Sequence, residues 1–293
     1  MGVPRVGEAF VIGIVGGGQM GAGIAEVCAA HGFDVVVVEQ DARAAEAAHR
    51  RIANSLDRAV ERGKRTRDDA DALLRRIAIG TDWEPLADAE FVIEAVSEQP
   101  DLKAEVFRRL SRITAGSRAV LATNTSSLPI AQIAAHTDCP DRVIGLHFFN
   151  PVPVMPLVEL VPSVLTSAET VLATEHLATQ GLARTVVRTV DRAGFIVNTL
   201  LMPYLLSAMR MYEAGYATAE DIDTAMVQGC AHPMGPLTLA DFIGLDTCAA
   251  IADSLYEEFK EPLYAAPPVL RRMVESGLVG RKGGRGFFTY PRP

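Results

Sequence analysis

The sequence predicts an α/β fold, in which a doubly wound parallel sheet over residues 1–190 is followed by an all-helical domain over residues 191–293. In the first part, short β-branched runs alternate with longer helical patterns, and this alternation is typical of parallel strands joined by right-handed helical crossovers. After residue 191, no strand-like run returns until residues 286–290. The length of 293 residues suits two domains of about 100 to 200 residues each.

The expected strands are short, and several are apolar on both faces, as strands buried between two layers of helices are. They cover residues 10–15, 35–38, 91–96, 119–122, 142–146 and 185–190. Helices are expected between them at residues 19–30, 42–62, 102–113, 130–135 and 167–180. The charged residues 62–76 predict a solvated helix pair or loop.

Helix-start signals divide the second domain. A helical pattern over residues 196–214 ends before Gly215, and Thr218, with Asp221 three residues later, can cap the next helix. Pro236 and Pro268 stand where helices commonly begin. These signals predict a bundle of consecutive helices.

The composition excludes several classes of protein. Apolar residues make up 49% and charged residues 22% of the chain, as in an ordinary globular protein, and the net charge of −8 disfavours nucleic acid or an anionic membrane as a partner. Residues 1–8 do not resemble a signal peptide, and no apolar run approaches the ~20 residues of a membrane helix. The four cysteines show no short C-x-x-C spacing, which predicts no metal site, no disulfide framework and a cytoplasmic location.

Residues 12–15, within an expected strand, run directly into a glycine-rich turn. This turn, Gly16-Gly17-Gly18-Gln19-Met20-Gly21, fits the pattern G-x-G-x-x-G. In that pattern the first glycine permits a tight turn, the second lets the backbone approach a pyrophosphate, and the third lets helix pack closely on strand. Glu39 ends the next strand about 20 residues later, which favours a Rossmann-type dinucleotide site over a merely structural turn. Because a carboxylate there accepts ribose hydroxyls and repels the extra phosphate of NADP, NAD is the predicted cofactor.

One histidine out of six has the position of a catalytic base. His147 ends a buried strand and precedes Phe148-Phe149-Asn150-Pro151-Val152-Pro153, whereas the other five lie in helical patterns or in a turn. Ligands of open α/β sheets bind outside the carboxyl ends of the strands. Since imidazole titrates near neutral pH, a histidine at that edge suits proton transfer.

Several motifs, in the same order along nearly the whole chain, resemble the 3-hydroxyacyl-CoA dehydrogenase family, and most closely its stand-alone bacterial 3-hydroxybutyryl-CoA dehydrogenases. They are Thr123-Asn124-Thr125-Ser126-Ser127-Leu128, the segment from His147 to Met155, Glu159, Gly194-Phe195-Ile196-Val197-Asn198, His232-Pro233-Met234-Gly235-Pro236, and the stretch from Gly280-Arg281-Lys282 to Phe288.

The resemblance implies a role for each matching residue. His147 matches the base that takes the hydroxyl proton, Glu159 the carboxylate that orients it, and Ser126 and Asn198 the residues that contact the substrate. Positions near the nicotinamide half of NAD are matched by Glu98, Lys103, Asn150 and Lys282. Contacts to CoA are matched by Ser55 and Arg62, with Lys64 close by. The resemblance also implies an acyl-CoA substrate and a homodimer formed through the helical domain.

Three readings remain open at this point. The first is an NAD-dependent (S)-3-hydroxyacyl-CoA dehydrogenase of short chains, and the second keeps the chemistry on a carrier-protein-bound or small hydroxy-acid substrate. The third is a non-catalytic NAD-binding protein, which would have no need of a base and its orienting carboxylate. Departures from the family pattern at Ala193, Thr199 and Glu39 bear on substrate preference and on the cofactor site, whereas the four catalytic positions are intact.

Overall fold

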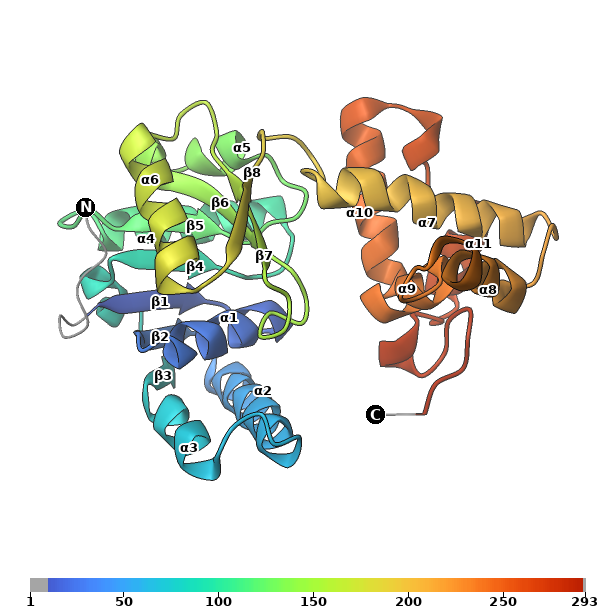
Figure 1. Ribbon diagram of the computed structural model, residues 1–293. Helices are drawn as coiled ribbons and strands as arrows, with labels where there is room; N and C mark the ends of the chain where they lie inside the picture. The colour runs from blue at the N-terminus through green and yellow to red at the C-terminus, as the bar shows by residue number, and fades with distance from the viewer. Residues whose placement is uncertain (1–9, 292–293) are drawn as a thin grey trace. The chain divides into compact units, whose positions relative to one another are not determined.

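The computed structural model describes residues 10–291 and divides into two compact units, one ending at Asp191 and the other beginning at Arg192 (Figure 1). Residues 1–8, which the sequence predicts not to be a signal peptide, lie outside the described residues. No helix within residues 10–291 is long and apolar enough to cross a membrane.

The described part of the first unit holds one sheet of eight strands in the order β3-β2-β1-β4-β5-β6-β7-β8 (Figure 1). The strands are β1 (Val11–Val15), β2 (Asp34–Val38), β3 (Ile77–Gly80), β4 (Phe91–Glu94), β5 (Val120–Thr123), β6 (Val143–Phe148), β7 (Leu157–Val161) and β8 (Thr185–Arg188). The strand order reverses between β1 and β4, where doubly wound sheets bind their ligands. The predicted Rossmann-type fold class is confirmed.

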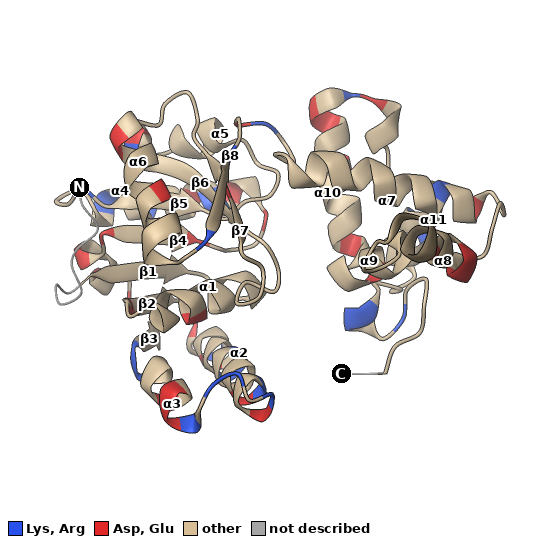
Figure 2. Cartoon of the chain, viewed as in Figure 1, with Lys and Arg blue, Asp and Glu red and all other residues tan. Residues whose placement is uncertain are grey.

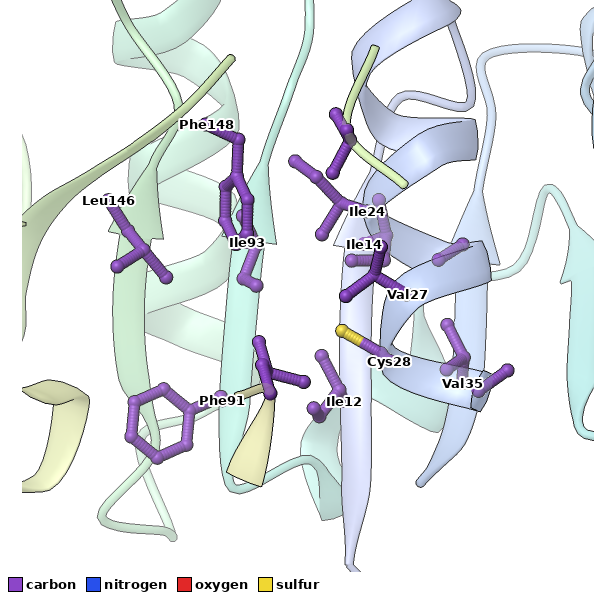
Figure 3. Close-up of a cluster of buried hydrophobic side chains, with 14 of the residues drawn as sticks. Ile12, Ile14, Ile24, Val27, Cys28, Val35, Phe91, Ile93, Leu146 and Phe148 are labelled. Carbon is purple, nitrogen blue, oxygen red and sulfur yellow. The ribbon is translucent and has the colours of Figure 1, made fainter. Parts of the chain in front are cut away.

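The helices of this unit connect the strands and lie against the sheet. They are α1 (Gln19–Ala30), α2 (Ala42–Glu61), α3 (Arg67–Arg75), α4 (Pro100–Ile113), α5 (Ile130–Ala134) and α6 (Ala168–His176), which continues into a π-helical turn at Leu177–Gly181. The main core forms where α1 packs on the central strands, and Ile14 of β1, Ile24 of α1 and Ile93 of β4 are fully buried there (Figure 3).

The sequence does not predict two of the strands, and one of these two runs antiparallel to one of its neighbours. β3 and β7 were not expected, and β7 pairs antiparallel with β6, whereas the other strand pairs are parallel in the part of the chain that the structure describes. The predicted parallel sheet therefore contains one antiparallel pair in the part of the chain that the structure describes. The connection between the two strands, residues 149–156, is shorter than the dozen or so residues that a parallel crossover needs, so the chain turns back beside the strand it has left.

The second unit is helical, as predicted. Its helices are α7 (Val197–Glu213), α8 (Ala219–Cys230), α9 (Pro236–Ile243), α10 (Leu245–Phe259) and α11 (Pro268–Glu275). The side chain of Thr218 caps α8 by accepting the Asp221 amide at 3.1 Å, which confirms the predicted cap. Fully buried Leu205, Leu237 and Leu255 belong to its separate core.

The strand expected at residues 286–290 is absent from the described chain, where only isolated bridges occur in this segment. The buried carboxylate of Asp241 accepts the backbone amides of Phe287 at 3.0 Å and Phe288 at 2.9 Å, and the Tyr290 hydroxyl at 3.0 Å. Because these amides are taken by a side chain, they do not enter a strand ladder. The side chains of Phe287 and Phe288 pack against the core of the second unit instead.

Candidate active site

The glycine-rich turn has the shape that a dinucleotide requires. Gly16 adopts φ 93°, and a Cβ on Gly21 would lie 1.8 Å from the Gly16 carbonyl oxygen, so both positions exclude larger residues. A Cβ on Gly18, in contrast, would meet no atom within 4 Å. Gly18 precedes α1 and makes no side-chain cap hydrogen bond, and the open space beside it, at the start of a helix, suits an anion.

Glu39 lies directly against this turn. Its Oε1 accepts the Gly17 amide at 2.6 Å, and its Oε2 accepts the Gln40 amide at 3.3 Å. The second strand therefore delivers a carboxylate to the pyrophosphate turn, where a ribose is expected to lie. The turn, the open space and this carboxylate together fit NAD.

His147 and Glu159 form a buried pair across the one antiparallel contact of the described sheet. They are register partners on β6 and β7, and His147 Nδ1 lies 2.8 Å from Glu159 Oε2. The relative exposures are 6% for His147 and 1% for Glu159. Since an ionised carboxylate can only accept, Nδ1 carries the hydrogen and Nε2 is the basic nitrogen of the neutral ring. A general base and its orienting acid would be arranged in this way.

The end of β5 is tied to the end of β6. Asn124 Oδ1 accepts the Phe148 amide at 2.8 Å, which fixes the backbone next to His147. Ser126 follows two residues later, in a turn that Glu98 holds through the Ser126 amide at 2.9 Å. Two of the predicted catalytic residues thus stand on neighbouring, cross-linked strand ends.

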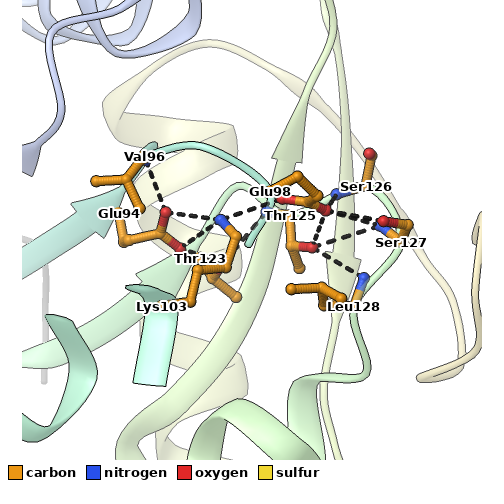
Figure 4. A network of polar contacts seen from close by, with 9 residues as sticks. All are labelled: Glu94, Val96, Glu98, Lys103, Thr123, Thr125, Ser126, Ser127 and Leu128. Atoms are coloured by element: carbon orange, nitrogen blue, oxygen red, sulfur yellow. Dashed lines mark hydrogen bonds and ion pairs between the residues drawn. The ribbon is translucent and has the colours of Figure 1, made fainter. Parts of the chain in front are cut away.

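The predicted nicotinamide residues of the first unit occupy the same edge of the sheet. The Gln19 side-chain amide donates to Asn150 Oδ1 at 3.0 Å, which links the glycine-rich turn to the loop after β6. Glu98 and Lys103 form an ion pair at 3.2 Å. Lys103 is only 1% exposed, and its ammonium group contacts the carboxylates of Glu94 and Glu98 (Figure 4).

The remaining predicted residues lie apart from this edge or in the second unit. Ser55 lies on α2 and hydrogen-bonds Glu26, and Arg62 and Lys64 are exposed just beyond the end of α2. Met20 packs against the core of the first unit. In the second unit, Asn198 lies in the first turn of α7, and Lys282 forms an ion pair with Asp246 at 2.6 Å.

Sequence reasoning missed three polar residues that hold predicted site residues, or the backbone next to them, in place. Glu94 is fully buried beneath Lys103, Asn124 fixes the end of β6, and Asp246 holds Lys282. Glu94 gave one signal, because a charged residue within an otherwise apolar strand pattern is uncommon unless it is paired.

Comparison with known proteins agrees with this geometry. Residues 11–192 match the NAD binding domain of 3-hydroxyacyl-CoA dehydrogenase, and residues 194–290 match the C-terminal domain of that family. A 3-hydroxybutyryl-CoA dehydrogenase of Mycobacterium tuberculosis is 54% identical over 279 residues, which cover 95% of this chain and 98% of the relative.

Solved structures give the same result. The crystal structure of M. tuberculosis FadB2 superimposes with a TM-score of 0.93 at 53% identity, over 96% of this chain and 98% of the other. That of (S)-3-hydroxybutyryl-CoA dehydrogenase PaaH1 from Ralstonia eutropha gives 0.88 at 42% identity, over 97% and 100% of the two chains. The prediction of NAD as the cofactor is confirmed by the matching NAD binding domain. The chain belongs to the 3-hydroxyacyl-CoA dehydrogenase family.

Proposed function

We propose that this chain catalyses the NAD-dependent oxidation of short-chain (S)-3-hydroxyacyl-CoA, such as 3-hydroxybutyryl-CoA, to the 3-ketoacyl-CoA, and the reverse reaction. The observation that supports this best is the buried His147–Glu159 pair at 2.8 Å, in a chain whose relatives are named for that reaction. A protein that only binds NAD would have no need of a base held by a buried acid.

Bound NAD supplies the acceptor for a hydride. His147 Nε2 takes the proton of the substrate hydroxyl while C3 loses the hydride, so that the C–O bond becomes a carbonyl. Glu159 holds the ring through Nδ1 and stabilises the imidazolium that forms. The Ser126 hydroxyl contacts the reacting oxygen, and the Asn198 amide contacts the substrate near the thioester. In the reverse direction the imidazolium returns the proton to the oxygen.

The proposed contacts of NAD are the residues that the sequence predicts for it. Glu39 accepts the adenosine ribose hydroxyls, and its charge disfavours the additional phosphate of NADP. Glu98, Asn150 and Lys282 lie near the nicotinamide half, and Lys103 acts there through Glu98. Gln19 and Met20 belong to the turn that carries the pyrophosphate.

The direct test is the consumption of NADH with acetoacetyl-CoA by the purified chain. Turnover that depends on both compounds would support the proposal. A folded protein that binds NADH but reduces no 3-ketoacyl thioester would reject it in favour of a binding role.

Basic residues after α2 are proposed to meet the phosphates of CoA. Figure 2 shows Lys and Arg gathered in the connection between α2 and α3, and Arg62 and Lys64 in it are exposed. Ser55, on the preceding helix, is the third proposed contact. Local charges of this kind can attract an anionic ligand to a chain of net charge −8.

Reversing these charges in Arg62→Glu/Lys64→Glu should raise KM for acetoacetyl-CoA severalfold and leave kcat nearly unchanged. The N-acetylcysteamine thioester, which lacks the nucleotide, should be affected much less. Steady-state assays with both thioesters measure the difference. The control Arg108→Glu/Arg112→Glu makes the same change in net charge at exposed positions of α4. Equal losses with both thioesters would contradict the assignment, and efficient turnover of an acyl carrier protein thioester with little of CoA would favour a carrier-bound substrate.

The helical unit is proposed to form a homodimer. Leu200 on α7 is 72% exposed, and Tyr216 just beyond α7 is 82% exposed, which is unusual for large apolar side chains near each end of one helix. We expect a dimer mass by light scattering at micromolar concentration, and dissociation by Leu200→Glu. A monomeric wild-type mass would contradict this proposal.

We also propose a cytoplasmic location. Cys28, Cys139, Cys230 and Cys248 are free thiols, and three of them are buried. Free thiols are typical of reducing compartments.

The net charge of −8 disfavours nucleic acid as a partner, because the chain lacks the summed positive field that binds phosphates.

A further inference from the structure

Glu94 is a fully buried carboxylate that the proposed reaction does not use. It ends β4, and its register partner on β5 is Thr123. Both of its oxygens contact Lys103 Nζ, at 2.7 and 2.9 Å (Figure 4). It also accepts the Thr123 hydroxyl at 2.7 Å and the Val96 amide at 2.7 Å. A carboxylate that accepts four hydrogen bonds from three donor groups is held rigidly in one orientation.

Lys103 links Glu94 to Glu98 through its ammonium group. It lies in the first turn of α4, where a cation opposes the helix dipole, and its side chain is 1% exposed. Neither feature favours a lysine for helix stability. Its Nζ lies 3.2 Å from Glu98 Oε2, so one ammonium group bridges a fully buried carboxylate and one that is 36% exposed.

Glu98 in turn holds the turn that carries Ser126. Its Oε1 accepts the amides of Ser126 at 2.9 Å and Ser127 at 3.2 Å, and the hydroxyl of Ser127 at 3.0 Å. The Thr125 hydroxyl donates to the same oxygen. One carboxylate oxygen thus fixes three consecutive residues, and the other oxygen is fixed by Lys103.

We propose that Glu94 is a positioning residue for the reaction: through Lys103 it fixes Glu98, and through Glu98 it sets the backbone of Thr125–Ser127 that presents Ser126 to the substrate oxygen. This inference rests on the proposed function for the role of Ser126. The contacts run from one strand end to the next without a gap. A buried ion pair is seldom needed for stability alone, because well-packed apolar residues often replace one without loss.

The Lys103 cation affects the pKa of Glu98 as well as its position. Burial raises the pKa of the Glu98 carboxyl, but the Lys103 cation and the hydrogen bonds from Thr125 and the Ser126 amide outweigh it and hold the pKa below its usual range. The charged groups around Glu98 are Lys103 from α4 and, behind it, Glu94 from β4, whereas the turn after β5 contributes hydroxyls and amides. Without the Lys103 cation the pKa of Glu98 rises, so Glu98 becomes protonated at a higher pH and releases the turn.

Two variants test the proposal. Glu94→Gln keeps the shape but removes the charge, and Glu94→Gln/Lys103→Met removes both charges and leaves none buried without a partner. Each should lower kcat for acetoacetyl-CoA reduction by about 10- to 100-fold, the effect of small misplacements of a catalytic group. In the double variant, the loss of activity toward acid pH should begin at a higher pH than in the wild type. Because protonated His147 is the active form for the reduction, acid does not inactivate His147, and the acid side of the pH profile reports the protonation of Glu98.

Hydrogen exchange of the Ser126 and Ser127 amides gives a readout that does not depend on turnover. It should accelerate in both variants. The control is Ser111→Ala, at a buried position of α4, the helix that carries Lys103. It removes the hydroxyl that accepts the Asp138 amide at 2.9 Å and leaves the contacts of Glu94, Lys103 and Glu98 intact. It should lower the melting temperature without altering kcat, the pH profile or exchange in the turn.

The outcomes separate the two proposals. Wild-type exchange in the turn of Glu94→Gln, or a double variant that fails to fold, would overturn the positioning role and assign the pair to stability. Wild-type kcat in a folded Glu94→Gln would overturn it equally. An inactive wild type would reject the proposed function alone, because the exchange measurement still decides the role of Glu94.

Discussion

Replacing His147 by Gln should lower kcat by about 10²- to 10⁴-fold, the usual contribution of a positioned acid–base group. Gln can hydrogen-bond to Glu159 but cannot take a proton at the reacting oxygen. The binding of NADH should survive, because the glycine-rich turn and Glu39 lie on other strands. Stopped-flow or steady-state reduction of acetoacetyl-CoA measures kcat, and fluorescence titration measures the Kd of NADH.

The exposed His136 offers a matched control, since His136→Gln makes the same change away from the site. It should leave kcat unaltered. Glu159→Gln should also slow turnover, because the amide can still hydrogen-bond to the ring but no longer stabilises the imidazolium. A His147→Gln enzyme with near-normal turnover would remove His147 from the mechanism.

The parts of the site that could be predicted from sequence are those built by local patterns. A strand followed at once by G-x-G-x-x-G has few structural solutions, so the turn and its helix could be predicted directly. His147 could be found because a polar residue ends an apolar strand. Both features depend on neighbours within a few residues along the chain.

The partners of these residues lie on strands that are distant in the sequence or run antiparallel, so local patterns do not predict them. Glu159 faces His147 only because β7 turns back against β6, and the short apolar run of β7 did not predict a strand. Its role came from family resemblance alone. The contacts of Glu94 join β4, β5 and α4, so they follow from sheet order rather than from spacing.

The prediction of a strand at residues 286–290 is wrong for the opposite reason. The short run of aromatic residues there is typical of a strand, but the amides of Phe287 and Phe288 donate to Asp241, 46 and 47 positions earlier in the chain. A buried carboxylate can thus replace a neighbouring strand as the acceptor of backbone amides. No local signal in the sequence distinguishes the two cases.

Two glycines of the nucleotide turn should respond to alanine in opposite ways, and the contrast tests the position of NAD. Gly18→Ala adds a methyl group where no protein atom lies within 4 Å, at φ −61°, so the fold should be affected only by the loss of glycine as a helix cap, less than ~1 kcal/mol. The same methyl group would lie where the pyrophosphate is expected to approach the backbone. The Kd of NADH should therefore rise by about tenfold or more, equivalent to ~1.4 kcal/mol.

Gly21→Ala places its methyl group 1.8 Å from the Gly16 carbonyl oxygen, so the turn or the helix must move. This variant should lose about 1 to 3 kcal/mol of unfolding free energy, as overpacked sites do, and bind NADH weakly as a consequence. Thermal or urea unfolding and NADH titration, performed on both variants, separate the two effects. Gly18→Ala protein of nearly wild-type stability that binds NADH as tightly as the wild type would place the pyrophosphate away from the start of α1, and the proposed cofactor contacts of Gln19 and Glu39 would then fail with it.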